Sequence, residues 1–174
     1  MANELQRLNE DVNSKGAQLK KIKYIVFDHD GTLVNTSIYD YALYPGMLNL
    51  LIHLEQKGIK LYVWTARNRN STVEILRSLG IIDKFDELAC GNEAKRKPEI
   101  EALENLLPGI DPKEVAMIGD SLGDIIGGSK FGASAFGAMW GHGSDYAKEA
   151  FLEHGAVESF MRVEELESYL EKLI

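Results

Sequence analysis

The stretch Tyr24-Ile25-Val26-Phe27-Asp28-His29-Asp30-Gly31-Thr32 decides how this chain folds and where its chemistry lies. Four apolar, mostly β-favouring residues predict a buried strand, which two carboxylates and a Gly-Thr turn follow. Because successive strand residues face opposite sides, we expect Asp28 and Asp30 to converge and His29 to point away from them. Two acids about 4 Å apart repel by roughly 4 kcal/mol at an effective dielectric of 20, and a hard divalent cation such as Mg²⁺ would relieve that repulsion. The alternative is a loop whose acids are simply solvated, so the rest of the chain decides.

The bulk composition describes one ordinary globular domain. The chain has 174 residues, of which 45% are hydrophobic and 26% charged. Its net charge of −8 disfavours a broad nucleic-acid interface or attraction to anionic lipid, although local cations can still hold a small anionic substrate. Cys90 is the only cysteine, which excludes an intramolecular disulfide and fits a reducing compartment. We find no signal-peptide core and no membrane-spanning stretch, so we expect a cytoplasmic protein without membrane contact.

The chain divides into two parts. Residues 1–20 are polar with a thin apolar stripe. They predict either an arm or helix that packs on the domain or on a second subunit of a homo-oligomer, or a loosely attached helix. From residue 21 to 174, strand-like runs alternate with helical patterns. This alternation implies right-handed β-α crossovers. We therefore predict an α/β fold: a doubly wound three-layer sandwich with a mostly parallel, Rossmann-like sheet.

The individual elements follow from apolar runs and from their start and stop signals. After the first strand, further strands are expected at Ile59–Trp64, Asp86–Ala89, Val115–Ile118 and Ala135–Met139. Helices are expected from Pro45 to Gly58, from a Ser71/Glu74 capping box to Gly80, from Pro98 to Leu107, and over Asp124–Phe131, Asp145–His154 and Val163–Leu173. In such sheets ligands bind beyond the carboxyl ends of the strands. The predicted strands bring Asp28, Asp30, Thr65 and Asp120 to that edge.

Several motifs in this order resemble those of the haloacid dehalogenase (HAD) superfamily. The run Asp28-His29-Asp30-Gly31-Thr32-Leu33 resembles its first motif. The others are Thr65 closing Leu61-Tyr62-Val63-Trp64, Lys97 in Lys97-Pro98-Glu99, and Ile118-Gly119-Asp120-Ser121-Leu122-Gly123-Asp124. The phosphoglycolate-phosphatase-like branch is the most similar, through Gly31-Thr32-Leu33-Val34, Tyr44-Pro45-Gly46 and Gly119-Asp120-Ser121. Each motif is weak alone, but together they span about residues 24–141.

The resemblance implies a HAD-like hydrolase domain over residues 21–174 and a Mg²⁺-dependent phosphomonoester hydrolase. Asp28 is the candidate nucleophile, which would form a phospho-aspartate. The Asp30 side chain would protonate the leaving oxygen and then activate water. Mg²⁺ would bind Asp28, the main-chain carbonyl of Asp30, Asp120, and Asp124 directly or through water. Asp124 also fits an ordinary acid in the first turn of a helix.

The phosphate of the substrate would meet a second set of residues. Thr65 offers its hydroxyl, and the following amides, those of Ala66 and Arg67, offer further donors. Lys97 supplies a positive charge. We prefer Lys97 to the two basic residues before it because Pro98 could start a helix directly behind it. The loop that begins with Arg67 is also a candidate for shaping the entrance to the site.

Two short segments predict that the site has no cap domain. HAD enzymes that discriminate small phosphates generally carry an inserted cap. Here Leu33–Leu43 leaves room only for a flap hairpin, and the segment from Thr65 to Lys97 holds one helix and one short strand. We therefore expect an open site, which implies either a large substrate presented from outside or a lid supplied by another subunit. The phosphorylated substrate is then a small molecule or a group presented by a larger partner.

Other functions of similar folds fit less well. A dehalogenase has no alkoxide to protonate, so Asp30 favours phosphate chemistry, and a mutase requires a cap. A phosphorylatable or phosphate-sensing signalling module with an acidic Mg²⁺ pocket stays open as the alternative. Such a module places its phospho-aspartate on a later strand, whereas Asp28 ends the first long strand here.

Overall fold

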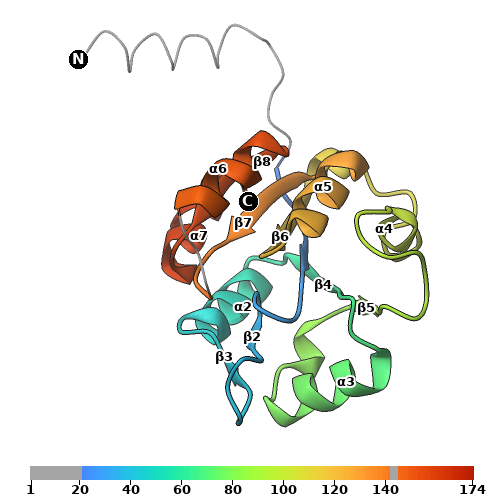
Figure 1. The fold of residues 1–174 in the computed structure, drawn as a ribbon, viewed down its shortest axis with the longest axis vertical. Helices are drawn as coiled ribbons and strands as arrows, with labels where there is room; N and C mark the ends of the chain where they lie inside the picture. Colours follow the sequence, from blue (N-terminus) through green and yellow to red (C-terminus); the bar gives the residue numbers. More distant parts are fainter. Residues whose placement is uncertain (1–20, 142–144) are drawn as a thin grey trace, which may run out of the picture.

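The computed structural model describes residues 21–141 and 145–174, and the expected N-terminal arm at residues 1–20 lies outside this part of the chain. Within the described ranges, six strands form one parallel sheet in the order β5-β4-β1-β6-β7-β8 (Figure 1). They are β1 (Tyr24–Phe27), β4 (Lys60–Trp64), β5 (Glu87–Ala89), β6 (Val115–Gly119), β7 (Ser134–Ala138) and β8 (Ala156–Phe160). The predicted doubly wound α/β fold is confirmed.

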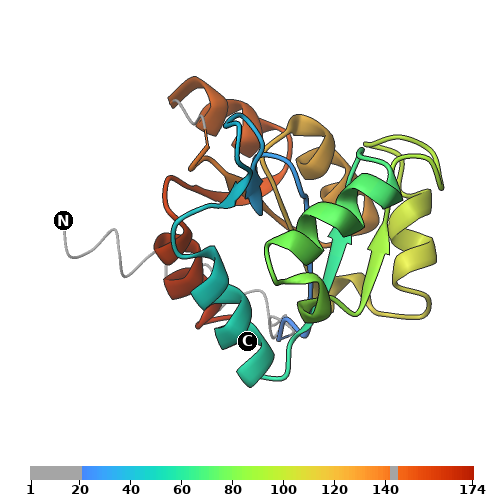
Figure 2. The ribbon, with the colours of Figure 1, turned by 90° about the horizontal axis from the view of Figure 1, so that it is seen from below.

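Helices cover both faces of this sheet. They are α2 (Met47–Gln56), α3 (Arg69–Ser78), α4 (Glu101–Leu106), α5 (Leu122–Phe131), α6 (Asp145–Glu153) and α7 (Val163–Leu170), with short turns η1 (Ile82–Lys84) and η2 (Pro112–Glu114). Ile25 and Phe27 of β1 pack in a cluster with α2, α3 and α7, whereas Val26 packs on the other face with α4. A further cluster joins α5 and α6 to β7. Figure 2 shows the layers from a second direction, with α2 beside α7.

The register of the strands brings three strand ends to one level. Phe27 of β1 lies opposite Val63 of β4 and Ile118 of β6. β1 ends at Phe27 itself, and β4 and β6 each end one residue beyond the residue that lies opposite Phe27. The residues that directly follow β1, β4 and β6 are Asp28, Thr65 and Asp120. Because the strands are parallel, these residues share the carboxyl edge of the sheet.

Two segments differ from the sequence-based expectation near the site. α3 begins at Arg69, because the side chain of Asn68 accepts a hydrogen bond of 3.0 Å from the Ser71 amide, so the predicted Ser71/Glu74 capping box is wrong. α4 begins at Glu101 rather than at Pro98. The Glu99 amide donates to the Arg96 carbonyl oxygen at 3.0 Å, so Lys97 and Pro98 lie in a turn. The reason given above for preferring Lys97 is therefore wrong.

A third difference is β8, the last strand of the sheet, which was not predicted. It lies at the edge of the sheet, where Val157 is exposed and Glu158 half-buried. Neither an apolar run nor a clean alternation marks a strand of this kind. α5 also begins earlier than expected, at Leu122, because Ser121 caps it.

The two positions where a cap domain would be inserted are fully described. The segment after β1 holds only a flap, the antiparallel hairpin of β2 (Val34–Asn35) and β3 (Ala42–Leu43). The segment after β4 holds α3, η1 and β5. Neither contains a cap. Among the described helices, none combines the length and the apolar character needed to cross a bilayer.

Candidate active site

Lys97 joins two buried carboxylates at the carboxyl edge of the sheet. Its Nζ atom lies 2.6 Å from Asp28 Oδ1 and 2.5 Å from Asp124 Oδ1. The three side chains are only 10%, 9% and 1% exposed, respectively. Burial alone would lower the pKa of Lys97, but attraction to Asp28 and Asp124 outweighs burial and raises it. Lys97 is therefore an ammonium held between two acids.

Asp124 both caps helix α5 and contacts Lys97. It lies in the first turn of α5, where Ser121 is the N-cap. Asp124 Oδ2 accepts hydrogen bonds from the Ser121 amide at 3.1 Å and from the Ser121 hydroxyl at 2.7 Å. This capping box leaves Oδ1 directed at Lys97. An ordinary acid in the first turn of a surface helix would be solvated, whereas Asp124 is fully buried.

Asp120 completes a group of three acids. Asp28, Asp120 and Asp124 each offer one carboxylate oxygen, and these oxygens lie within 4.8 Å of one another. The loop after β1 makes room for Asp120 through Gly31, which has a φ of +82°. A Cβ atom at position 31 would lie 2.1 Å from Asp120 Oδ2, so only glycine permits this approach.

The charges and donor atoms of this group fit a divalent cation. Three carboxylates against one ammonium leave two negative charges in excess. Burial raises the pKa of Asp28 well above its usual value, and Asp124 and Asp120 add to this rise while Lys97 opposes it. A cation would keep these acids ionised, and an all-oxygen donor set is the kind that Mg²⁺ prefers. Asp28, Asp120 and Asp124 are thus the side chains that could hold it.

The side chain of Asp30 lies in a different environment. Arg67 Nη2 donates to Asp30 Oδ1 at 2.5 Å, and Arg67 Nε donates to Oδ2 at 3.1 Å. Buried His29 has its Nδ1 atom 3.3 Å from Asp30 Oδ2, outside hydrogen-bond geometry. The expectation that His29 points away from both acids therefore does not hold for Asp30. Burial alone would raise the pKa of Asp30, but His29 and Arg67 outweigh it and hold the pKa well below its usual value.

The predicted phosphate-binding residues line the same edge. Thr65 is buried, its amide donates to the Ala89 carbonyl oxygen at 2.9 Å, and its hydroxyl accepts from the Arg67 amide at 3.1 Å. Ala66 is exposed between Thr65 and Arg67. The structure brings these residues to the rim beside Lys97 and Asp28. Their contact with a phosphate, like the proposed metal contact of the Asp30 main-chain carbonyl, stays a prediction.

Asp30 and Asp120 line a hollow of about 380 Å³ at this edge of the sheet. Thr36 and Ser37 of the flap line it as well. Its volume is at the lower end of the range for small-molecule sites. The only signal for these flap residues in the sequence is their place in the short segment after the first motif.

Trp64 is a second residue whose place in the site the sequence did not reveal. The Lys97 Nζ atom lies 4.9 Å from the centre of the Trp64 ring. A cation at this distance is attracted by the ring. In the sequence, Trp64 looks like an ordinary core residue at the end of a strand.

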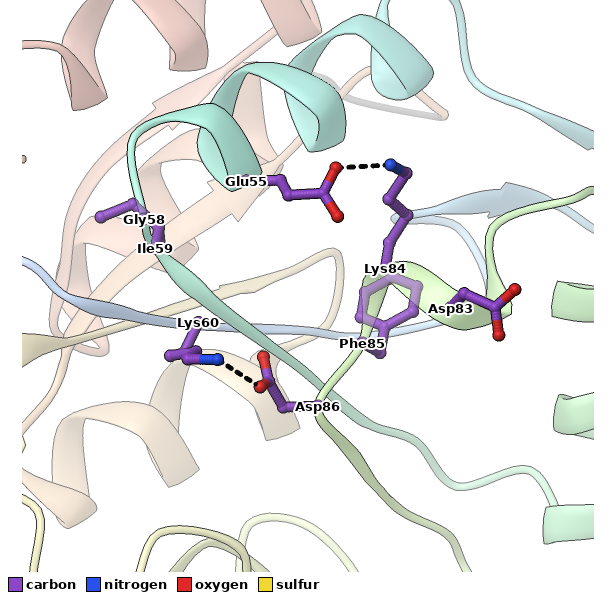
Figure 3. A pocket seen from close by; sticks show the side chains of 8 residues that line it. All are labelled: Glu55, Gly58, Ile59, Lys60, Asp83, Lys84, Phe85 and Asp86. Carbon is purple, nitrogen blue, oxygen red and sulfur yellow. Dashed lines mark hydrogen bonds and ion pairs between the residues drawn. The ribbon is translucent and has the colours of Figure 1, made fainter.

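A second hollow, of about 270 Å³, lies at the opposite end of the sheet, beside the amino ends of β4 and β5 (Figure 3). Two ion pairs line it. Lys60 Nζ lies 2.9 Å from Asp86 Oδ1, and Lys84 Nζ lies 2.5 Å from Glu55 Oε2. Lys60, Asp86 and Glu55 are largely exposed, unlike the charged groups at the carboxyl edge.

Comparison with known proteins identifies the family. The sequence model described as haloacid dehalogenase-like hydrolase matches residues 38–138, more than half of the chain. The chain therefore belongs to the haloacid dehalogenase-like hydrolase family, as the motifs predicted.

Curated relatives are similar over part of their length. Phosphoglycolate phosphatase from Agrobacterium fabrum is 31% identical over 102 residues, which are 57% of this chain and 44% of the relative. Phosphoglycolate phosphatase from Rhodospirillum rubrum is 27% identical over 154 residues, 87% of this chain and 60% of the relative. A putative pyrophosphatase from Clostridium perfringens is 32% identical over 96 residues, 52% of this chain and 44% of the relative. The chain thus spans about half the length of these relatives.

Solved structures share the fold. A putative beta-phosphoglucomutase from Thermotoga maritima superposes with a TM-score of 0.78 at 19% identity, over 88% of this chain and 100% of the other. A predicted phosphatase from Clostridium acetobutylicum gives a TM-score of 0.77 at 19% identity, with the same coverage. At such identity, the likeness concerns the fold alone, and it confirms the predicted Rossmann-like HAD architecture.

Proposed function

We propose that this chain is a Mg²⁺-dependent phosphomonoester hydrolase that works through a phospho-aspartate at Asp28. The observation that carries the proposal is the buried contact of Lys97 with Asp28 and Asp124, beside Asp120, where β1 and β6 end. Membership of the HAD-like hydrolase family and relatives named phosphoglycolate phosphatase and pyrophosphatase support phosphate-releasing chemistry.

In the first step, a carboxylate oxygen of Asp28 attacks the phosphorus atom, and the bond from phosphorus to the leaving oxygen breaks. Lys97 balances negative charge on the phosphoryl oxygens. Asp30 gives a proton to the leaving oxygen. In the ligand-free arrangement Asp30 is held as a carboxylate by Arg67, so the acid role requires that these two side chains separate first.

In the second step, Asp30 takes a proton from a water molecule, whose oxygen attacks the phosphorus atom. The bond from phosphorus to Asp28 breaks, and inorganic phosphate leaves. A depressed pKa for Asp30 keeps it in the base form in the ligand-free site. When bound, Mg²⁺ supplies the positive charge that lets a carboxylate approach a phosphate dianion.

The substrate that fits best is a small phosphorylated molecule. The hollow of about 380 Å³ that Asp30 and Asp120 line has room for a short leaving group beside the flap.

The test is release of phosphate from p-nitrophenyl phosphate with Mg²⁺ present. We expect turnover that EDTA abolishes and added Mg²⁺ restores. Turnover that persists after EDTA treatment and dialysis would overturn the metal requirement. Phosphorylation of Asp28 to one equivalent without turnover would instead favour the signalling module.

A further inference from the structure

The Arg67 guanidinium already binds a carboxylate inside the candidate site. It contacts both oxygens of Asp30 and also donates from Nη1 to the Ser71 hydroxyl at 2.9 Å. The Arg67 side chain is 24% exposed and the Asp30 side chain 34% exposed. A two-point contact of this kind selects the planar geometry of a carboxylate, or two oxygens of a phosphate.

Tyr41 of the flap also contacts this guanidinium. The Arg67 Cζ atom lies 5.9 Å from the centre of the Tyr41 ring. Tyr41 directly precedes β3, so Arg67 connects the loop after β1, the first turn of α3 and the flap. An arginine fixed by three elements is pre-organised for an anion that arrives at this place.

The position of Asp30 defines where the second anion would lie. In the proposed reaction, Asp30 gives its proton to the leaving oxygen, so the atoms beyond that oxygen lie next to Asp30 and Arg67. Lys97 is engaged with Asp28 and Asp124, on the phosphoryl side. Arg67 therefore faces the leaving group rather than the transferred phosphoryl group.

We propose that Arg67 determines substrate specificity, because it exchanges its two-point contact with Asp30 for a second anionic group on the leaving group. The inference rests on the proposed phosphatase function and names its substrate class: small phosphate esters or anhydrides whose leaving group carries a carboxylate or a second phosphate. Such a substrate frees Asp30 by taking its place at Arg67. A substrate with a neutral leaving group leaves Asp30 bound to Arg67.

The test compares two substrates that differ in one group. 2-Phosphoglycolate carries a carboxylate where ethyl phosphate carries a methyl group. We expect wild-type protein with saturating Mg²⁺ to prefer 2-phosphoglycolate by about 10- to 100-fold in kcat/KM, the range for a hydrogen-bonded contact between charged groups. Arg67→Met is expected to abolish most of this preference, and Arg67→Lys to retain a part of it.

Arg69 offers a matched control two residues away. It pairs with Glu93 and donates to the Leu88 carbonyl oxygen at 2.5 Å, away from Asp30. Arg69→Met is therefore expected to keep the wild-type preference. Because each variant is measured on both substrates, the ratio of the two rates cancels any loss of folded protein. Comparing this ratio between variants and wild type cancels the intrinsic difference between the leaving groups.

The outcomes separate the two proposals. If the wild-type protein hydrolyses both substrates but shows no preference, or if Arg67→Met keeps the wild-type ratio, the role of Arg67 is overturned and the phosphatase function stands. If the wild-type protein hydrolyses neither substrate nor p-nitrophenyl phosphate, the phosphatase function fails and the role of Arg67 fails with it. Loss of the preference in Arg67→Met but not in Arg69→Met supports the inference.

Discussion

The two ends of the sheet both place lysine–carboxylate pairs beside a hollow, but they bury these pairs to different extents. At the carboxyl edge, Lys97 is 10% exposed and its partner Asp28 is 9% exposed. At the amino ends, Lys60 is 59% exposed and Asp86 is 35% exposed (Figure 3). The distances are similar, at 2.6 Å and 2.9 Å. The two pairs thus differ in how far they are buried from solvent, not in the distance between their charges.

The difference in burial indicates which of these charge pairs serves stability and which serves a function. An exposed pair contributes about 0–1 kcal/mol to stability, whereas taking an ion out of water costs several kcal/mol that its partner has to offset. Burying three acids and one lysine together therefore has no explanation in stability. Groups of this kind concentrate where chemistry is performed.

The largest expected effect is at Asp28. An amide cannot accept the phosphoryl group, so Asp28→Asn should lower turnover of p-nitrophenyl phosphate by about 10⁴-fold or more. Asp83→Asn, at the hollow of Figure 3, should leave turnover unchanged because Asp83 is exposed and distant from the site. A residual rate above one tenth of wild type in Asp28→Asn would contradict the proposed mechanism.

The next effect is at Lys97, and it has two parts. Lys97→Met removes the ammonium between Asp28 and Asp124, which should lower kcat by about 10²- to 10³-fold and stability by about 3–5 kcal/mol. Urea unfolding in the absence of Mg²⁺ measures the second part.

The stability of Lys97→Met should also depend on pH in a defined direction. Folded Asp28 has a raised pKa, so it binds a proton more readily than the unfolded chain does. The deficit therefore shrinks as pH falls, because protonation relieves the repulsion between acids. A deficit that stays constant with pH would show that Lys97 stabilises the fold through packing instead.

A smaller effect is expected at Trp64, beneath the same ammonium. A Cβ atom on Gly127 would lie 2.6 Å from Trp64 Cη2, so the glycine lets helix α5 hold the ring closely. A cation–π contact of this kind is worth about 0.5–2 kcal/mol. Trp64→Leu should lower kcat about tenfold, and Trp64→Phe should restore most of it because the phenyl ring keeps the aromatic face. If Trp64→Leu kept the wild-type kcat, Trp64 would serve only to pack the core.

The comparison also explains how much the sequence could predict. Asp28, Thr65 and Asp120 were placed correctly at one edge because parallel strands and a register that follows the apolar runs leave little freedom. The family motifs add Lys97 and Asp124. The reason given for Lys97 failed, because a turn and not a helix follows it.

Two features of the structure could not be predicted from the sequence: the contacts of the Arg67 side chain and the edge strand β8. Arg67 follows Thr65 by two positions, but nothing in the sequence tells that its guanidinium binds Asp30 and meets Tyr41. Strand β8 was missed because an edge strand with exposed Val157 shows no clean pattern. Both depend on tertiary packing rather than on local sequence.

The smallest effect is expected at the amino ends of the sheet. Lys84 pairs with Glu55, with side chains 24% and 52% exposed. Lys84→Met should change stability by about 1 kcal/mol or less, with kcat unaffected. The difference from wild type should decline further in about 1 M salt, where charges more than about 3 Å apart are screened. The deficit of Lys97→Met should persist there, because buried pairs are screened far less. If both variants lost stability equally and responded equally to salt, burial would not be what distinguishes the two ends of the sheet.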